Sequence, residues 1–175
     1  METDVFNDGR QRKVLVFVTR INENGKKEVL MGMHPKQHKR NFPGGAIGDR
    51  YEIWSETPKE AAIREVKEET GFDIEEPKKL GKMTFKFPDG NHIDLSIFIS
   101  DKWTETDEKS EGLEDLQWYE TDKLPYNEMW ETDRVWLPFA LQEYPFEGSM
   151  TFSEKEGYSK FVVQNSFDNP ELRVV

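Results

Sequence analysis

One stretch of the chain, residues 57–72, specifies a helix at both of its ends. Thr57, Pro58 and Glu60 provide a capping hydroxyl, a proline at the first helical position and the glutamate of a capping box. Gly71 provides the stop, because glycine adopts the left-handed conformation that ends many helices. The sequence therefore predicts an α-helix between Thr57 and Gly71, and the fold has to accommodate what this helix carries on its surface.

Three carboxylates of this helix, Glu65, Glu68 and Glu69, lie within one short stretch. At about 100° per residue, they fall within a single arc of roughly 100°. Neighbouring like charges cost about 0.2–0.5 kcal/mol per pair in an unassisted helix. A bound divalent cation would reverse the sign of that interaction, so the arc is a candidate metal site.

The chain contains no cysteine and only three histidines, so carboxylate oxygens are the main ligands it offers to a metal. Such hard ligands suit Mg2+ or Mn2+ better than Zn2+. The alternative is a solvated acidic face on which Lys59, Arg64 and Lys67 act as ion-pair partners within the helix. Arg64 lies one turn before Glu68, a spacing at which its guanidinium can hold that carboxylate in position.

Two glycines, Gly44 and Gly45, lie in the segment that leads towards this helix. Paired glycines let a main chain approach a ligand or a metal without a Cβ atom in the way. A basic run precedes them, formed by His34, Lys36, His38, Lys39 and Arg40. That run is either an ordinary polar loop or a source of attraction for phosphate.

The whole chain has 175 residues, a formal net charge of -11 and a pI near 4.9. This length predicts one domain, residues 1–175, in which residues 166–175 form a tail. The acidic charge argues against a nucleic-acid groove, which needs a positive footprint. No apolar run approaches the roughly 20 residues that cross a bilayer, and the first residues do not begin a signal peptide. We therefore expect no membrane association and a cytoplasmic location.

The hydrophobic pattern predicts strands interrupted by two helices. Strands are expected at residues 13–19, 27–33, 80–87, 92–100 and 116–120, with two more at 149–152 and 160–164. Turn sequences at residues 22–25 and 88–91 separate the first two pairs. A second helix is expected over residues 131–141, begun by Thr132 or Asp133. Residues 101–111 are highly charged and aperiodic, and they predict a mobile loop.

The glutamate helix and its flanks resemble the Nudix box, whose consensus is G-x5-E-x7-R-E-U-x-E-E-x-G-U, where U is a bulky aliphatic residue. The chain matches this consensus at the right spacing from Glu56 through Gly71, and Phe72 stands where an aliphatic residue is usual. Ten residues, 46–55, rather than five separate Gly45 from Glu56, so an inserted segment must bulge from this loop. The resemblance implies the Nudix fold, an α/β (α+β) sandwich with a mixed β-sheet between α-helices.

The resemblance to Nudix proteins also implies roles for individual residues. The expected ligands of Mg2+ or Mn2+ are the Gly44 carbonyl, Glu65, Glu68 and Glu69. An acid from a later loop often completes such a site, and we expect Glu111, with Glu114 as the alternative. The implied catalytic residues are Glu68, Glu65 and Arg64. One glutamate, Glu68 first and Glu65 second, would take a proton from the attacking water.

The second half of the chain resembles one branch of this family, the MutT-homologue hydrolases that act on oxidised purine nucleoside triphosphates. The similarity is carried by residues 124–130 (LPYNEMW), Asp133, residues 136–142 (WLPFALQ) and residues 146–148 (FEG). In that branch an asparagine, a tryptophan and two adjacent aspartates surround the purine. These positions fall on Asn41, Trp130, Thr132 and Asp133, so one of the two aspartates is replaced by threonine here.

A base pocket needs an aromatic face for stacking and amide or carboxyl groups for the edge of the base. Trp130, Asn41 and Asp133 supply both kinds of group. Phe85 and Trp136 are the expected walls, and Gly45 is expected to lie beside the substrate. For Trp136, in the middle of the predicted helix, a core position is the alternative.

The activity implied by the resemblance is metal-dependent hydrolysis of a nucleoside triphosphate to a nucleoside monophosphate and pyrophosphate. The expected substrate is an oxidised purine nucleotide such as 8-oxo-dGTP. One alternative is a Nudix hydrolase of another nucleoside diphosphate derivative, such as a dinucleoside polyphosphate, a nucleotide sugar or an RNA 5′ end. The other is a non-catalytic Nudix domain that senses a nucleotide. The expected partner is a small-molecule nucleotide, and the sequence leaves the oligomeric state open.

Overall fold

The computed structural model describes residues 10–48, 56–153, 157–165 and 173–174. Its helices are α1 (Pro58–Thr70), α2 (Asp133–Ala140) and a short 3-10 helix, η1 (Tyr126–Glu128). The strands, in chain order, are β1 (Arg10–Ile21), β2 (Lys27–His34), β3 (Lys39–Asn41), β4 (Gly44–Ala46), β5 (Phe72–Ile74), β6 (Lys78–Lys86), β7 (His92–Ser100), β8 (Trp103–Glu105), β9 (Glu114–Glu120), β10 (Phe146–Ser153), β11 (Gly157–Asn165) and β12 (Arg173–Val174). None of the described helices is long and apolar enough to cross a lipid bilayer.

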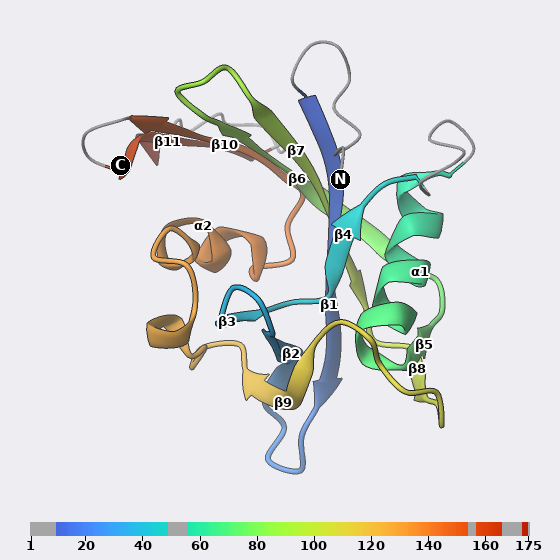
Figure 1. Ribbon diagram of the computed structural model, residues 1–175. Helices are drawn as coiled ribbons and strands as arrows, with labels where there is room; N and C mark the ends of the chain where they lie inside the picture. The colour runs from blue at the N-terminus through green and yellow to red at the C-terminus, as the bar shows by residue number, and fades with distance from the viewer. Residues whose placement is uncertain (1–9, 49–55, 154–156, 166–172, 175) are drawn as a thin grey trace.

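Ten of the described strands form one mixed sheet, in the order β12-β11-β10-β6-β7-β1-β2-β3, with β4 paired to β1 and β9 paired to β2. The β1–β7 and β6–β10 pairs are parallel, whereas the others are antiparallel. Strands β5 and β8 form a separate antiparallel pair. Figure 1 shows α1 and α2 on opposite sides of β1. The predicted sandwich of a mixed sheet between helices is confirmed.

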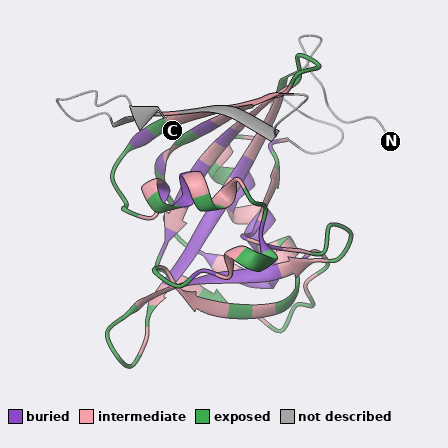
Figure 2. Cartoon of the chain, turned by 90° about the vertical axis from the view of Figure 1, so that its left-hand side faces the viewer, coloured by how far each residue is buried: buried purple, intermediate pink, exposed green. Residues whose placement is uncertain are grey.

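Strand β1 is the central strand and is buried on both faces. Val14 and Val16 pack in one core with Ala62 of α1. Phe17 belongs to a second core, which contains Leu137 of α2. Successive side chains of a strand point to opposite faces, so one continuous apolar strand serves both cores. Figure 2 shows this as buried residues concentrated on the central strands, with exposed residues at the turns.

Helix α1 has the ends that its sequence predicts. The Thr57 hydroxyl accepts a hydrogen bond from the Glu60 amide at 3.2 Å, and the Glu60 carboxylate accepts one from the Thr57 amide at 2.7 Å. Gly71 has a φ of 75° and donates its amide to the Lys67 carbonyl at 2.9 Å. The capping box and the glycine stop together define both ends of the helix that carries the acidic residues.

The mobile loop predicted over residues 101–111 is wrong at its beginning, because Trp103–Glu105 form β8 against β5. The Trp103 ring lies 5.2 Å from the Phe72 ring and 5.1 Å from the Trp118 ring, measured between centroids. Its indole N–H also donates to the Thr19 carbonyl at 3.0 Å. Trp103 therefore anchors β8, although the charged residues around it show no alternation of polar and apolar residues.

Helix α2 begins at Asp133 with Thr132 as its N-cap, close to the predicted range of 131–141. Helix η1 precedes it, and the buried Met129 follows η1 directly. Leu137 is fully buried on the inner side of α2. These buried contacts hold Trp130 and Asp133 at the start of the helix.

The other predicted strands correspond to β1, β2, β6, β7, β9, β10 and β11. The short strands β3, β4, β5, β8 and β12 were not predicted, because two or three residues carry too little alternation. The insertion expected at 46–55 lies outside the described residues from position 49 onwards. Of the predicted tail, 166–175, the structure describes only Arg173–Val174, which pair with β11.

Replacing Trp103 by alanine should lower the free energy of unfolding by about 3 kcal/mol, the scale for removal of a packed aromatic side chain. Replacing Trp130, which is 47% exposed, should cost less than about 1 kcal/mol. Urea unfolding followed by circular dichroism measures both values. Equal losses in the two variants would contradict the anchoring role of Trp103.

Candidate active site

The acidic face of α1 lies against β4. Oε2 of Glu69 accepts a hydrogen bond from the Gly44 amide at 2.9 Å. Glu65 is 9% exposed and covers Gly45, where an added Cβ atom would come within 2.5 Å of the Glu65 carboxylate. Glu65 therefore leaves no room for a side chain at Gly45, and at Gly44 an added Cβ atom would come within 2.2 Å of the Val14 carbonyl oxygen.

The backbone groups of Gly44 point away from β1. Residues facing each other in an antiparallel pair alternate between hydrogen-bonded and non-bonded positions. The Val16 amide donates to the Pro43 carbonyl at 2.9 Å, and the Ile47 amide donates to the Arg12 carbonyl at 3.0 Å. Gly44 pairs with Leu15 at the next, non-bonded position, so its amide and its carbonyl both lie on the open edge of β4. The amide meets Glu69 there.

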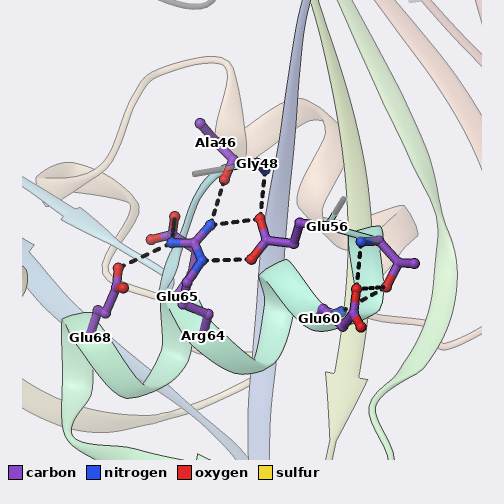
Figure 3. Close-up of polar contacts among 8 residues, drawn as sticks. Ala46, Gly48, Glu56, Glu60, Arg64, Glu65 and Glu68 are labelled. Atoms are coloured by element: carbon purple, nitrogen blue, oxygen red, sulfur yellow. Dashed lines mark hydrogen bonds and ion pairs between the residues drawn. The ribbon is translucent and has the colours of Figure 1, made fainter. Parts of the chain in front are cut away.

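Arg64 joins this edge to the glutamates, as Figure 3 shows. Its guanidinium makes a two-pronged contact with Glu56 at 2.7 and 3.0 Å. Nη1 donates to Glu65 at 2.8 Å and to Glu68 at 3.1 Å. Nη2 also donates to the Ala46 carbonyl at 2.9 Å. The predicted positioning of Glu68 by Arg64 is present, and Arg64 holds Glu65 and the strand as well.

Burial governs the protonation of the two inner glutamates. It raises the pKa of Glu69 to about 7, with the Gly44 hydrogen bond opposing the shift and the charges of Glu65 and Glu68 adding to it. Burial also raises the pKa of Glu65, and Arg64 opposes that shift. The hydrogen bond to Glu56 is the main reason why the pKa of Arg64 lies above its ordinary value. A further positive charge beside Glu69 would favour its ionised form.

Of the predicted metal ligands, Glu65 and Glu69 lie against Gly45 and Gly44 of β4, and the set does not form a preformed cage. Among the described residues, no three acidic or histidine side chains converge at metal-ligand spacing. Arg64 occupies oxygens of Glu65 and Glu68, and Glu69 faces Gly44. The donors nevertheless fit a hard divalent cation, since carboxylates on one helix face meet a strand edge that carries a backbone carbonyl.

The loop before β9 packs on the C-terminal end of α1. The Glu111 amide donates to the Glu68 carbonyl at 2.9 Å. Gly112 lies against Glu69, where an added Cβ atom would come within 2.6 Å of Cγ. Glu111 is thus fixed beside the acidic face through its backbone while its side chain is exposed. The alternative ligand, Glu114, is also exposed, at the start of β9.

The residues predicted to face the base begin three positions before Gly44. Asn41 ends β3, and its amide nitrogen donates to Gln37 at 3.2 Å. Lys39 shares a face of β3 with Asn41, because the two are two residues apart. The Lys39 ammonium lies 5.4 Å from the centroid of the Trp130 ring. The structure therefore brings this face of β3 beside the exposed Trp130.

Asp133 lies at the first position of α2 and accepts a hydrogen bond from the Trp136 indole at 3.1 Å. Burial raises the pKa of Asp133 to about 6, and that hydrogen bond opposes the shift. Trp136 is 2% exposed, so the core position is the one observed. Phe85 packs against it edge-on at 6.1 Å. Thr132 makes no side-chain capping bond.

Two residues have structural roles that were not anticipated. Glu56 holds Arg64 and also accepts a hydrogen bond from the Gly48 amide at 2.6 Å. The sequence signal for this role was the fixed spacing between Glu56 and Arg64 in the Nudix consensus. Arg40, expected in a polar or phosphate-attracting loop, is buried and bonded to Asp115 and Glu128.

The chain is similar to known proteins in both sequence and fold. A family model described as the NUDIX domain matches residues 9–139. An oxidized purine nucleoside triphosphate hydrolase from Danio rerio is 31% identical over 147 residues, covering 82% of this chain and 88% of that protein. The protein of the same description from Mus musculus is 31% identical over 132 residues, covering 73% and 81%. The crystal structure of a MutT protein from Bacillus halodurans matches with a TM-score of 0.67 at 19% identity, covering 87% of this chain and 97% of that one.

The chain therefore belongs to the Nudix family. It is a Nudix pyrophosphohydrolase, a class of enzyme that generally uses divalent metal ions and acts on small-molecule nucleotides.

The pKa of Glu69 predicts how stability depends on pH in the absence of divalent cations. The ordinary value is 4.5 and the folded value is about 7, so the folded chain binds more protons than the unfolded chain between these values. Stability should then fall as the pH rises through this window. Glu69→Gln should remove that fall and be more stable than the wild type at pH 8 by about 2 kcal/mol, a value discounted for partial exposure.

Urea unfolding in EDTA across pH 4.5 to 8 measures this difference. Glu68→Gln is a graded control, because it removes one of the charges that add to the raised pKa of Glu69, so the fall in stability should become smaller without disappearing. Identical profiles for wild type and Glu69→Gln would contradict the burial of an ionisable Glu69.

Proposed function

We propose that the protein hydrolyses purine nucleoside triphosphates, oxidised ones such as 8-oxo-dGTP foremost, to nucleoside monophosphate and pyrophosphate with Mg2+ or Mn2+. The observation that carries the proposal is the meeting of Glu65 and Glu69 with Gly45 and Gly44. Relatives named as oxidized purine nucleoside triphosphate hydrolases match most of the chain and support the substrate class. A cytoplasmic location and a single domain over residues 1–175 are parts of the same proposal.

The metal end of the proposed site consists of Glu65, Glu68, Glu69, the Gly44 carbonyl and Glu111. When bound there, a divalent cation supplies neutralisation of phosphate charge and a more acidic water. The other steps belong to the protein. Glu68 is the first candidate for general base, because its exposed side chain is accessible to the attacking water. Glu65 is the second candidate.

Arg64 acts in this proposal as a positioning residue. It already fixes Glu65, Glu68 and the β4 edge through Nη1 and Nη2. Its anchor, Glu56, is only 14% exposed in its side chain, so the guanidinium has a rigid support on the far side. The positively charged guanidinium of Arg64 therefore holds the glutamates beside the proposed position of the phosphates.

The base end consists of Asn41, Trp130, Thr132 and Asp133, with Gly45 beside the phosphates and Phe85 as a more distant wall. The exposed Trp130 ring offers a face for stacking on a purine. The Asp133 carboxyl has a pKa raised to about 6, so it changes between donor and acceptor near neutral pH. Thr132 contributes a hydroxyl, which can both donate and accept.

A substrate panel tests the proposal directly. Oxidised and ordinary purine triphosphates are incubated with Mg2+ next to a dinucleoside polyphosphate, a nucleotide sugar and a capped RNA, and phosphate and pyrophosphate are measured separately. We expect pyrophosphate and a monophosphate from the oxidised purine triphosphates at the highest kcat/KM. Glu69→Gln should lower kcat by about a hundredfold or more, because even the loss of an outer-shell partner of a metal site costs about 10- to 100-fold.

Circular dichroism is used to check that the Glu69→Gln variant is folded. Near-normal turnover by that variant would remove Glu69 from the site. Preference for one of the other compounds would replace the substrate while keeping the enzyme class, and inertness toward the whole panel would favour the nucleotide-sensing alternative.

A second variant tests the base end. Asp133→Ala should raise KM for a purine triphosphate by about tenfold, the equivalent of one lost hydrogen bond at ~1.4 kcal/mol. KM for a diphosphate without a purine should change much less. Asp133→Asn, which keeps the shape and an acceptor for the Trp136 indole, is the matched control for helix integrity. Equal changes in both substrates would show that Asp133 does not contact the base.

A further inference from the structure

The side chain of Arg40 lies in an unusual position for a basic residue of a surface loop, because the residue is only 4% exposed. Its neighbours Lys39 and Asn41 face the opposite side of β3, where Trp130 lies. Arg40 therefore faces away from the proposed substrate and cannot serve as a direct phosphate ligand in this arrangement. Its role follows from the segments of the chain that it connects.

Arg40 connects two segments that are distant in the chain. Nη1 donates to the Asp115 carbonyl at 2.7 Å, and Nη2 donates to the Asp115 carboxylate at 3.0 Å. Nε donates to the Glu128 carboxylate at 3.1 Å. The guanidinium also lies 5.7 Å from the centroid of the Tyr119 ring. Its planar fork matches this set of acceptors, which a lysine ammonium would not.

The Asp115 side of this connection leads to the metal end. Asp115 has a φ of 47°, a left-handed conformation that is uncommon for residues other than glycine, and Arg40 bonds both its carbonyl and its side chain. Two residues earlier, the Leu113 amide donates to the Glu69 carbonyl at 3.1 Å. Leu113 is buried at 3% exposure. The segment is therefore fixed on α1 at one end and on Arg40 at the other.

The Glu128 side leads to the base end. Glu128 is the last residue of η1, and Trp130 follows two residues later. Helix η1 has no side-chain cap of its own, and Met129 is the buried residue next to it. Trp130 is itself 47% exposed, so packing restrains its ring less than it restrains the buried Met129. The contact from Arg40 to Glu128 supplies a restraint close to that ring.

We propose that Arg40 is a positioning residue that sets the separation between the metal end and the base end of the site. It does so because its single guanidinium bonds Asp115 and Glu128 at the same time. This inference rests on the proposed function, since it assigns Trp130 to the base. It predicts that loss of the fork weakens recognition of the purine and leaves the hydrolytic step largely intact.

Arg40→Met removes the charge and the hydrogen bonds while retaining an apolar side chain that fills part of the same space. We expect KM for a purine triphosphate to rise about tenfold and kcat to change less than about threefold. The matching sugar triphosphate without a base should show no rise in KM. A merely structural role would instead lower the fraction of active enzyme, and hence kcat, equally for both compounds.

Two further variants define the controls. Arg40→Lys keeps the charge without the fork and should retain most of the KM defect. Arg20→Met removes another arginine that is ion-paired to a carboxylate, Glu28, and lies over a tryptophan, Trp118, and it should leave both KM and kcat unchanged. Full recovery of KM by Arg40→Lys would show that charge alone matters and would overturn the proposal.

Hydrogen exchange gives a measurement that does not depend on activity. The Glu128 and Met129 amides, which bond to Pro125 and Tyr126, should exchange at least about fivefold faster in Arg40→Met. The Gly71 amide at the end of α1 should be unchanged. Unchanged exchange at Glu128 and Met129 would overturn the proposal whatever the substrate is. Faster exchange without a purine-specific rise in KM would overturn it while the proposed hydrolysis stands.

Discussion

Two carboxylates, the buried Glu65 and the partly buried Glu69, lie between α1 and β4, and they determine how the other residues of the site are arranged. Taking a carboxylate out of water costs several kcal/mol unless charge or hydrogen bonds compensate it. Glu65 receives compensation from Arg64, whereas the hydrogen bond from the Gly44 amide compensates Glu69 only in part. The charged form of Glu69 is therefore only partly stabilised within the protein, and a cation bound beside it would stabilise that form.

The packing around Glu65 and Glu69 explains how the fold tolerates the cost of holding these carboxylates away from water. β1 contributes to both cores and pairs with β7 from Arg10 to Val18, so the strand that carries β4 is held rigidly. The capping box and Gly71 define both ends of α1, and Ala62 and Val66 fix its inner side. The stability of the two cores thus offsets the cost of placing like charges against a strand.

The parts of this arrangement that the sequence predicts are those set by neighbours in the chain. Capping residues, turn residues and strand alternation act within a few positions, so α1, the β6–β7 hairpin and most strands were predicted correctly. The grouping of Glu65, Glu68 and Glu69 was predictable for the same reason, since one helix carries all three. Trp136 could not be assigned between core and pocket, because both positions ask for a large aromatic ring.

The parts that the sequence did not predict depend on contacts between distant residues. β8 exists because Trp103 packs on Phe72 and Trp118, and nothing in its charged neighbourhood shows this. Arg40 is buried because its acceptors arrive from 75 and 88 residues away. Long-range polar contacts of this kind leave no periodic pattern in the sequence. The sequence therefore does not distinguish a solvated basic loop from a buried arginine that bonds two acidic residues.

We infer that the acidic face of α1 and the open edge of β4 form a site for a divalent cation. Crystals soaked in a manganese salt and measured at the manganese absorption edge test it most directly. We expect an anomalous peak within coordination distance of Glu65, Glu69 and the Gly44 carbonyl, with Arg64 withdrawn from at least one glutamate. A map without a peak at these residues, with Arg64 still bridging Glu65 and Glu68, would contradict it.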